Sequence, residues 1–442
     1  MNSELLQQVR VLDPVSGTDQ LADVLITDGI IRAVETEISE IPADTAVRDC
    51  QGLILAPGLV DLYSHSGEPG FEERETWLSL LEAAATGGFT RLAVLPDTLP
   101  PLDNPAGLAA LNQKLNQIRQ KLNTLEEAEK IAPPQLSCWG ALTLGVEGQQ
   151  MTELAELAFS GVVGFADGHP VSNLALIRRS LEYLQPLGKP VALWASDHKL
   201  AGDGVAREGV QSIRFGLPGN PGIAESAALA ALLEVIAAIG TPVHLMRIST
   251  CRGVQLIEEA KAKGLPVTAS TTWMHLLFNT EDLGNYDPNF RLEPPLGNPV
   301  DQAELIRGVR EGIIDAISID HTPYTYEEKT VPFAEAPSGV IGLELALPLL
   351  WHSLVETGDW SALELWQRLS TNPAICLQET PAAIAPEESA ELVLFNPQAT
   401  WKVERHTLKS LSANTPCLGQ QLTGRVVKTW CPMKKKRVGS SK

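Results

Sequence analysis

Short apolar runs alternate with longer helical stretches through the middle of this 442-residue chain, and no other feature narrows its fold as far. Eight of these runs are candidate strands, at residues 58–62, 90–95, 136–142, 162–166, 190–194, 242–247, 266–270 and 314–319. Eight strand–helix units over roughly 260 residues are typical of a closed parallel barrel with its helices outside. We therefore predict an α/β fold built on a TIM-type (β/α)8 barrel, with a doubly wound open sheet as the alternative.

The two ends of the chain have the pattern of β-structure. Residues 22–35 alternate apolar and polar positions on both sides of Asp28-Gly29, which is a strong hairpin signal. Residues 391–395 and 424–428 again have the composition of strands. The simplest arrangement pairs these late strands with the early hairpin, so that both termini build one small β-sandwich domain.

These patterns divide the chain into three parts. Residues 1–55 and 385–432 are predicted to form the composite β-sandwich domain, and residues 56–384 the barrel. Residues 433–442, which contain Lys-Lys-Lys-Arg, are predicted to be a basic disordered tail.

Composition argues against several classes of function. A formal net charge of −20 disfavours nucleic acid or an anionic membrane as a partner. The six cysteines form no CxxC pair, and GxxxxGK[ST], HExxH and a helix-opening GxGxxG are missing, so zinc ribbons, phosphate loops, zincins and dinucleotide folds have no support. The N-terminus has no basic segment before an apolar run, and the apolar stretch at residues 224–241 is interrupted by Glu225 and Glu234. We expect a soluble cytoplasmic protein.

Polar residues at the carboxyl ends of the predicted strands are candidate site residues, because parallel barrels build their active sites there. The first strand runs into Asp61-Leu-Tyr63-Ser-His65, where the alternation of side chains directs both Tyr63 and His65 toward the barrel mouth. The ends of other strands carry Asp97, Asp167, Trp194, Arg247 and Asp320.

Several of these segments closely resemble a known family. The segments APGLVDLYSHSGEPGFEE (56–73), GFADGHPV (164–171), PVHLMRIST (242–250) and DAISIDHTPY (315–324) resemble dihydroorotase, in the cyclic amidohydrolase branch of the amidohydrolase superfamily. The similarity covers nearly the whole chain, from residue 10 to residue 430. It implies a barrel with a composite β-sandwich from both termini, which is the fold that the strand count predicts independently.

The resemblance also implies a metal site, from which this chain departs. Family enzymes hold one or two zinc ions with an HxH pair, an acidic bridge, two further histidines and an aspartate. The matching positions here are Tyr63, His65, Asp167, Trp194, Arg247 and Asp320. Only His65, Asp167 and Asp320 keep a side chain that can ligate zinc.

The positions that the resemblance assigns to substrate binding have changed as well. The family's carboxylate-binding arginine is Gly67, its substrate-binding asparagine is Asp97, and the asparagine and arginine that flank its PPL segment are Glu293 and Gly297. A carboxylate at Asp97 would repel the anionic dihydroorotate.

Two of the replacements bear directly on metal binding. Trp194 offers an N–H donor and no lone pair. Arg247 stays protonated, and two cations ~4 Å apart repel by roughly 4 kcal/mol at an effective dielectric constant of about 20. We expect the Arg247 guanidinium to bridge to Asp167, with Asp320 as a further partner, in place of the second zinc ion. The alternative is one zinc ion at low occupancy on His65, Asp167 and Asp320, with Asp320 as general base.

The leading hypothesis is a catalytically inactive dihydroorotase-like protein without a cofactor. By resemblance to inactive dihydroorotase-like subunits that associate with aspartate transcarbamoylase, we expect a structural or regulatory role in pyrimidine biosynthesis. A second hypothesis is an active cyclic-amide hydrolase of the dihydroorotase, dihydropyrimidinase or allantoinase type, with one metal or none. A third is a small-molecule binding module. The sequence leaves the oligomeric state open, including a homo-oligomer.

Overall fold

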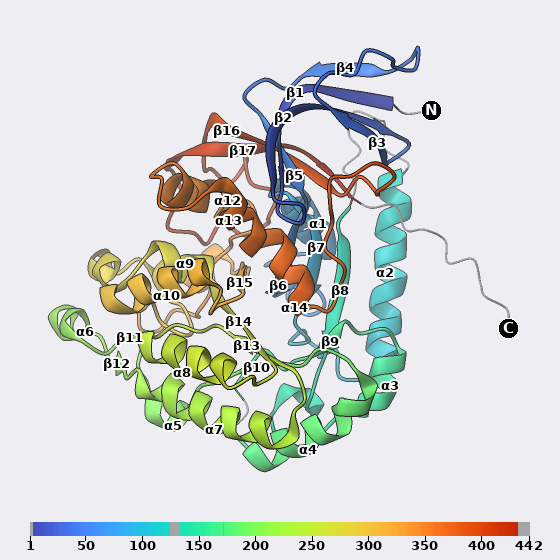
Figure 1. Ribbon diagram of the computed structural model, residues 1–442. Coiled ribbons are helices and arrows are strands. Elements are labelled where there is room, and N and C mark those ends of the chain that lie inside the picture. Colours follow the sequence, from blue (N-terminus) through green and yellow to red (C-terminus); the bar gives the residue numbers. More distant parts are fainter. Residues whose placement is uncertain (1–2, 124–132, 171, 432–442) are drawn as a thin grey trace, which may run out of the picture.

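A computed structural model describes residues 3–123, 133–170 and 172–431 of the chain. The predicted basic tail at residues 433–442 lies outside the described residues. Figure 1 shows a barrel surrounded by helices, with a sheet from both ends of the chain on one side of it. No helix in the described part of the chain is both long enough and apolar enough to cross a membrane.

In the described part of the chain, eight parallel strands form the barrel and match the eight predicted strands. They are β6 (Leu59–Ser64), β7 (Phe89–Val94), β8 (Gln135–Gly140), β9 (Gly164–Phe165), β10 (Ala192–Trp194), β13 (Val243–Met246), β14 (Val267–Thr272) and β15 (Ala316–Ser318). Parallel ladders join neighbouring strands in the order β6-β7-β8-β9 and in the order β10-β13-β14-β15. A parallel bridge between Phe165 and Val191 links these two halves. The ring closes between β15 and β6, where the His65 N–H donates to the His321 carbonyl at 2.8 Å. The closed barrel is therefore confirmed over the open sheet.

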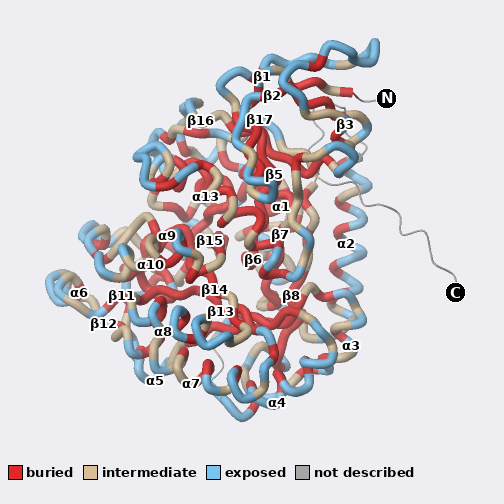
Figure 2. Tube along the Cα trace, in the orientation of Figure 1, coloured by how far each residue is buried: buried red, intermediate tan, exposed pale blue. Residues whose placement is uncertain are grey.

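Helices cover the outside of the barrel, and one follows each of the first seven strands. These are α1 (Trp77–Thr86), α2 (Pro105–Asn123), α3 (Leu154–Phe159), α4 (Leu174–Leu184), α7 (Ile223–Ile239), α8 (Cys251–Ala262) and α10 (Pro299–Glu311). After β15 come α12 (Ala346–Leu350), α13 (Ala362–Trp366) and α14 (Asn372–Cys376), with π-helical segments at Trp351–Val355 and Gln367–Thr371. Figure 2 shows the barrel strands buried and the helices exposed on their outer faces.

Short elements occupy the connections between these units. They comprise α5 (His198–Ala201), α6 (Val210–Phe215), α9 (Trp273–Leu277), α11 (Tyr326–Lys329), the paired strands β11 (Ala206–Arg207) and β12 (Gly219–Asn220), and 3-10 turns at Leu144–Val146, Gln185–Leu187, Thr280–Asn285 and Pro288–Phe290. Many begin with a side-chain cap. In α5, for example, the Asp197 carboxylate accepts hydrogen bonds from the backbone N–H groups of Lys199 and Leu200.

Large rings fill the interior of the barrel because small residues face them. Tyr63 and Trp139 are 0% and 1% exposed and belong to a cluster that includes Ala93, Ala166 and Ala316. Alanine on several strands leaves the volume that each ring occupies, which is how a barrel interior reaches the packing density of a solid core. The strand ends are thereby held at fixed positions around the mouth.

One branched seven-stranded sheet unites the two ends of the chain. Its strands are β1 (Ser3–Asp13), β2 (Thr18–Thr27), β3 (Ile30–Glu35), β4 (Ala46–Asp49), β5 (Ile54–Pro57), β16 (Leu392–Lys402) and β17 (Gln421–Trp430). The predicted hairpin turn is present, with φ of 50° at Asp28 and 73° at Gly29. The late strands meet β5 instead of the hairpin, because β1 already pairs with β2 on one side and with β5 on the other.

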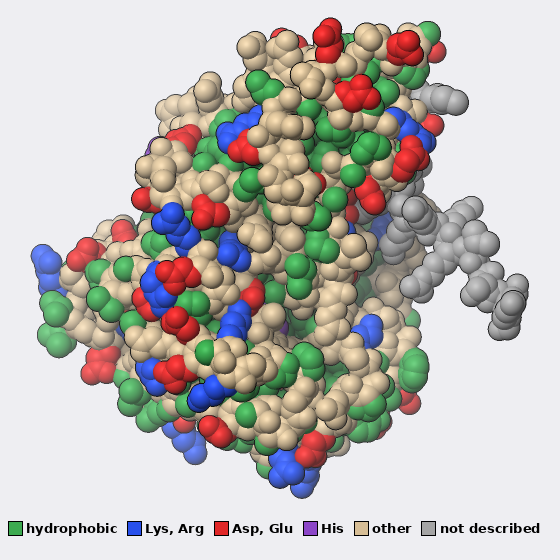
Figure 3. Space-filling model, in the orientation of Figure 1, with side chains coloured by type: hydrophobic (Ala, Val, Ile, Leu, Met, Phe, Trp, Pro, Cys, Tyr) green, Lys and Arg blue, Asp and Glu red, His purple; other side chains and the backbone are tan. Residues whose placement is uncertain are grey.

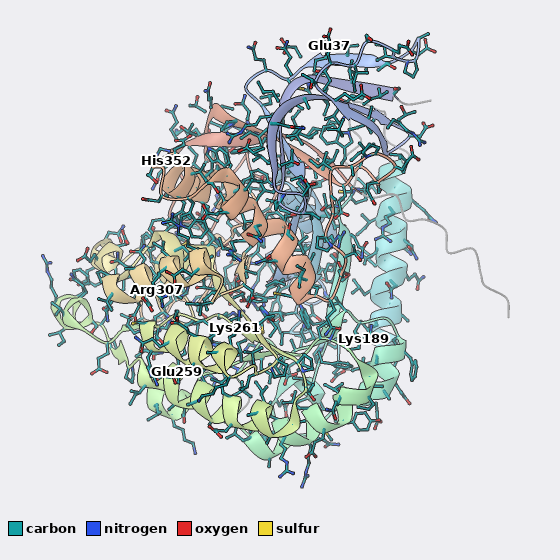
Figure 4. The ribbon with its side chains drawn as sticks, viewed as in Figure 1. Glu37, Lys189, Glu259, Lys261, Arg307 and His352 are labelled. Carbon is teal, nitrogen blue, oxygen red and sulfur yellow. The ribbon has the colours of Figure 1, made fainter. Side chains whose placement is uncertain are left out.

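Charged side chains of both signs are interspersed over α8 and α10 (Figure 3). Arg307 on α10 forms ion pairs with Glu258 on α8 and with Glu304 and Glu311 on its own helix. Figure 4 labels Arg307 together with Glu259 and Lys261 of α8. Exposed pairs of this kind contribute little to stability, so the barrel core carries the fold.

Candidate functional site

A cavity of about 150 Å³ opens at the carboxyl ends of the barrel strands. Five of the residues predicted from the strand ends line it: His65, Asp97, Trp194, Arg247 and Asp320. Gly67 and Glu293 also line the cavity. Tyr63, Asp167 and Gly297 do not line the cavity, although each lies within four residues of one that does.

Arg247 and Asp320 form a bidentate ion pair across the mouth. The guanidinium Nε donates to Oδ2 of Asp320 at 2.8 Å, and Nη2 donates to Oδ1 at 2.6 Å. The third guanidinium nitrogen, Nη1, donates to the carbonyl of Gly168 at 2.8 Å. Although burial opposes charge on the Asp320 carboxyl, Arg247 and His65 hold its pKa well below the ordinary value. The expected pairing of Arg247 with Asp320 is therefore present.

The expected pairing of Arg247 with Asp167 is wrong. The Asp167 carboxylate accepts hydrogen bonds from the backbone N–H groups of Leu142 and Thr143, at 2.8 and 3.0 Å, and from the Thr143 hydroxyl at 2.7 Å. Burial nevertheless raises the pKa of Asp167. The loop after β8 thus satisfies both carboxylate oxygens of Asp167. Arg247 donates instead to the carbonyl of the next residue, Gly168, and to Asp320.

His65 lies between two carboxylates. Its Nδ1 is 2.6 Å from Oδ2 of Asp97, and its Nε2 is 3.5 Å from Oδ1 of Asp320. Burial alone would lower the pKa of His65, but Asp97 and Asp320 outweigh burial and raise it to about 9. The Nη2 of Arg247 lies 3.0 Å from Nε2 of His65, which accepts a hydrogen bond when the ring is neutral. The two carboxylates favour the protonated ring. Two cations and two carboxylates then make a neutral cluster, with Oδ1 of Asp320 shared by both cations.

Tyr63 points into the barrel core instead of the mouth, contrary to the prediction from strand alternation. Its hydroxyl accepts from the backbone N–H of Arg247 at 3.1 Å and from the hydroxyl of Ser318 at 2.8 Å, and lies 2.9 Å from the hydroxyl of Ser270. Burial raises the pKa of Tyr63 to about 12, so the phenol stays neutral. The ring belongs to the buried cluster inside the barrel, and its hydroxyl holds the backbone N–H of Arg247.

Trp194 lies beside the guanidinium. The Arg247 Cζ atom is 4.8 Å from the centroid of its ring, within the range of a cation–π contact. Within the described part of the chain, the indole Nε1 is buried without a hydrogen-bond partner. Trp194 therefore stabilises the Arg247 cation and offers no lone pair to the cavity.

Comparison with known proteins decides the family. The Dihydro-orotase-like family profile matches residues 52–252. A "Probable dihydroorotase-like protein" of Synechocystis sp. is 46% identical over 97% of this chain and 99% of its own length. A "Dihydroorotase" of Syntrophus aciditrophicus is 35% identical over 96% of this chain and 97% of its own.

The chain belongs to the dihydroorotase-like family.

Solved structures of cyclic-amide hydrolases share the fold of this dihydroorotase-like chain. An L-hydantoinase from Arthrobacter aurescens superimposes with a TM-score of 0.80 at 21% identity, over 98% of this chain and 97% of its own. A dihydropyrimidinase from Brevibacillus agri gives 0.78 at 20% identity, over 97% and 94% of the two chains. The predicted amidohydrolase fold, a barrel accompanied by a sheet from both termini, is confirmed.

Two glycines stand where dihydroorotases are expected to bind substrate with arginine. A Cβ atom at Gly67 would collide with backbone atoms of Phe71 and Glu75, so the loop after β6 has closed over that position. A Cβ atom at Gly297 would collide with Asp301. Because backbone atoms cannot move aside cheaply, Gly67 in particular cannot be replaced by a longer side chain without remodelling the loop.

The other two substrate positions of this dihydroorotase-like chain are acidic. The carboxylate of Asp97 is bound to His65, and the pKa of Asp97 is lowered because His65 outweighs the effect of burial. Glu293 is exposed at the rim, where its carboxylate accepts from the Ser338 hydroxyl at 3.4 Å. Neither side chain attracts an anion to the mouth.

Sequence reasoning missed a further cation at this mouth, Arg74. Arg74 pairs with Glu328 and lies over the rings of Phe71 and Tyr324, at 4.0 and 4.8 Å from their centroids. These contacts join the loop after β6 to α11 and to the loop before it, which are distant in the sequence. The segment Phe71-Glu-Glu-Arg74 was a visible signal, but its partner could not be located without the fold.

The donors present do not fit the zinc site that the family implies. A hydrolytic zinc site needs about three free N, O or S ligands and an open position for water. No group of three or more His, Cys, Asp or Glu residues within the described ranges is arranged to hold a metal ion. His65 and Asp320 are bound to Asp97 and Arg247, and Asp167 is bound to Thr143. The single-metal set of His65, Asp167 and Asp320 is not assembled.

Proposed function

We propose that this chain is a dihydroorotase-like protein without dihydroorotase activity, and that it acts as a structural or regulatory subunit in pyrimidine biosynthesis, with aspartate transcarbamoylase as its partner. The proposal rests on two features: the chain keeps the fold of the family, and the residues at its barrel mouth differ from those of the family enzymes. It includes a cytoplasmic location and the lack of a resident cofactor.

The ion pair between Arg247 and Asp320 is the observation that carries the proposal. By resemblance, Asp320 stands at the position of the family's general base, yet Arg247 holds its pKa well below the ordinary value. A carboxylate with so low a pKa is a weak base, because general base catalysis works best when the pKa of the base lies near the working pH. The guanidinium also occupies both carboxylate oxygens.

Substrate recognition supports the same conclusion. Dihydroorotate is an anion, and the positions that would bind it here are Gly67, Asp97, Glu293 and Gly297. None of these supplies a cation. The cations that do line the cavity, His65, Arg74 and Arg247, are paired with carboxylates of the protein.

The partner role rests on the resemblance to inactive dihydroorotase-like subunits that associate with aspartate transcarbamoylase. The 46% identical relative in Synechocystis sp. carries the cautious name "Probable dihydroorotase-like protein". A fold that persists after its catalytic groups have been replaced is consistent with a role carried by its outer surfaces.

Activity and metal content test the first half of the proposal. The chain, purified without chelator, should contain less than a tenth of a zinc ion per chain and should show no turnover of dihydroorotate, hydantoin, dihydropyrimidine or allantoin, with or without added zinc. A family member that keeps all its zinc ligands serves as the positive control. Turnover of any of these rings by the pure protein would favour the active-hydrolase hypothesis instead.

Assembly tests the second half. The aspartate transcarbamoylase of the same organism should co-purify with this chain, and its oligomeric mass should fall when the chain is withheld. If transcarbamoylase has the same mass and activity with and without the chain, the partner role is wrong even if the chain is inactive.

A further inference from the structure

A second cavity, of about 170 Å³, lies between α4 and α7 at the carboxyl end of β10. Figure 1 places these two helices side by side next to the loop that carries α5. Ala227, Ala228 and Ala231 on α7 line the cavity together with Leu174 and Ile177 on α4. An alanine side chain ends at Cβ, so the space that a larger residue would fill stays open between the helices.

Among the residues that the structure describes, Asp197 is the one charged residue that lines this cavity. Its Oδ1 caps α5 by accepting from the backbone N–H groups of Lys199 and Leu200, at 2.8 and 3.1 Å. Its Oδ2 accepts no hydrogen bond from the residues that the structure describes, and the Asp197 side chain is partly exposed. A carboxylate oxygen with free lone pairs at the edge of an apolar cavity is suited to bind a cationic hydrogen-bond donor.

Trp194 lines both this cavity and the cavity at the barrel mouth. Its ring is also in contact with the Arg247 guanidinium, as described above. The α4/α7 cavity therefore differs from the mouth in chemistry while sharing one wall with it. The mouth is lined by paired charges, whereas the described residues around the α4/α7 cavity give it mostly apolar walls, the hydroxyls of Ser172 and Ser196, and the Asp197 carboxylate.

We propose that the α4/α7 cavity is a binding site for a compact organic amine, whose apolar body lies between the two helices and whose ammonium group binds Asp197. Largely apolar walls with a few well-placed polar groups are the usual composition of small-molecule sites. An ammonium of ordinary pKa is charged at neutral pH, and the chain's net charge of −20 favours cations over anions. The site stands independently of the function proposed for the barrel mouth.

Three probes of similar shape and different charge test the site: cyclohexylamine, cyclohexanol and cyclohexanecarboxylate. Isothermal titration of the full chain at pH 7 should give saturable binding of cyclohexylamine, weaker binding of cyclohexanol and none of the carboxylate. Asp197→Asn should weaken amine binding by about tenfold and leave cyclohexanol binding unchanged, because asparagine still caps α5 but carries no charge.

A matched pair of variants on α7 tests the location. Ala231→Leu fills the cavity and should abolish binding of both the amine and the alcohol, whereas Ala237→Leu adds the same volume at an exposed position and should bind like the wild type. If Ala231→Leu does not fold, Ala228→Leu replaces it, and Asp197→Asn still tests the contact.

Three results would overturn the site: no saturable binding of cyclohexylamine, equal binding of the amine and the carboxylate, or undiminished amine binding in both Asp197→Asn and the folded cavity-filling variant.

Discussion

Arg247 and Asp320 are joined by two hydrogen bonds of 2.8 and 2.6 Å, and both residues have left-handed backbone conformations, with φ of 55° and 53°. Each such conformation costs about 1–3 kcal/mol for a residue other than glycine. The side chains come from the ends of β13 and β15 and are nearly buried. The mouth therefore keeps two strained backbone positions, which are held in place by an ion pair between their own side chains.

Breaking the ion pair between Arg247 and Asp320 should destabilise the protein strongly, because it leaves a nearly buried charge without a partner. Arg247→Gln leaves the buried Asp320 carboxylate without its cation, and we expect the free energy of unfolding to fall by about 3–5 kcal/mol. Urea denaturation at pH 7 measures the change. Arg178→Gln, which removes an exposed pair with Glu182, is the control and should change stability by less than about 0.5 kcal/mol. A small effect at Arg247, equal to that of the control, would contradict the structural role of the pair.

His65 should make stability depend on alkaline pH. Its pKa is raised to about 9 in the folded chain, above the ordinary value of about 6.5, so the folded state binds the proton more tightly than the unfolded state. This contribution is fully present below pH 6.5 and is lost as the pH rises through 9. We expect the difference in unfolding free energy between wild type and His65→Gln to shrink by on the order of 3 kcal/mol over that window.

The difference in unfolding free energy between the wild type and His65→Gln reports on His65, because the other buried groups titrate in both proteins. Urea denaturation at several pH values measures it, and an NMR titration of the His65 ring gives the pKa directly. A difference that stays constant from pH 6 to 9.5, or a ring that titrates near 6.5, would mean that the ring is not held as a cation by Asp97 and Asp320.

The strand pattern predicted the barrel and the convergence of Arg247, Asp320 and His65, because the ends of parallel strands meet at one face whatever the details of packing. It could not predict the partner of Asp167. That carboxylate is satisfied by Thr143 in the loop after β8, largely through backbone N–H groups, which leave no trace in a sequence.

Alternation along a strand also failed to place Tyr63. His65 and Tyr63 have the same parity, yet His65 lines the cavity while the Tyr63 hydroxyl reaches Ser270 and Ser318 within the barrel. Alternation along a strand determines which face of the sheet a side chain lies on. Whether that side chain lines the cavity or packs in the barrel core depends on which neighbouring residues are small enough to leave space for it. The small residues Ser270 and Ser318 lie on β14 and β15, more than 200 residues away in the sequence.

Restoring the family's arginine at position 67 should damage the protein instead of restoring substrate binding. Even Gly67→Ala places a Cβ against the backbone of Phe71 and Glu75, and we expect a loss of about 1–3 kcal/mol in unfolding free energy. Gly107→Ala lies in the helix α2 with ordinary contacts, so it should be neutral or slightly stabilising. Thermal denaturation of the two variants compares them, and equal melting temperatures would show that the loop after β6 yields easily.

Zinc binding should return when the cation at the mouth is exchanged for imidazole. The double variant Trp194→His, Arg247→His removes the guanidinium, frees Asp320 and adds two donors to His65, whose ring Asp97 already orients through Nδ1. We expect about one zinc ion per chain by elemental analysis, against less than a tenth in the wild type. The matched variant Trp194→Phe, Arg247→Met also removes the charge but adds no donor, and it should stay without zinc.

If both double variants bind zinc equally, charge alone excludes the ion. If neither folded variant binds it, the geometry of the strand ends has drifted beyond what the metal accepts.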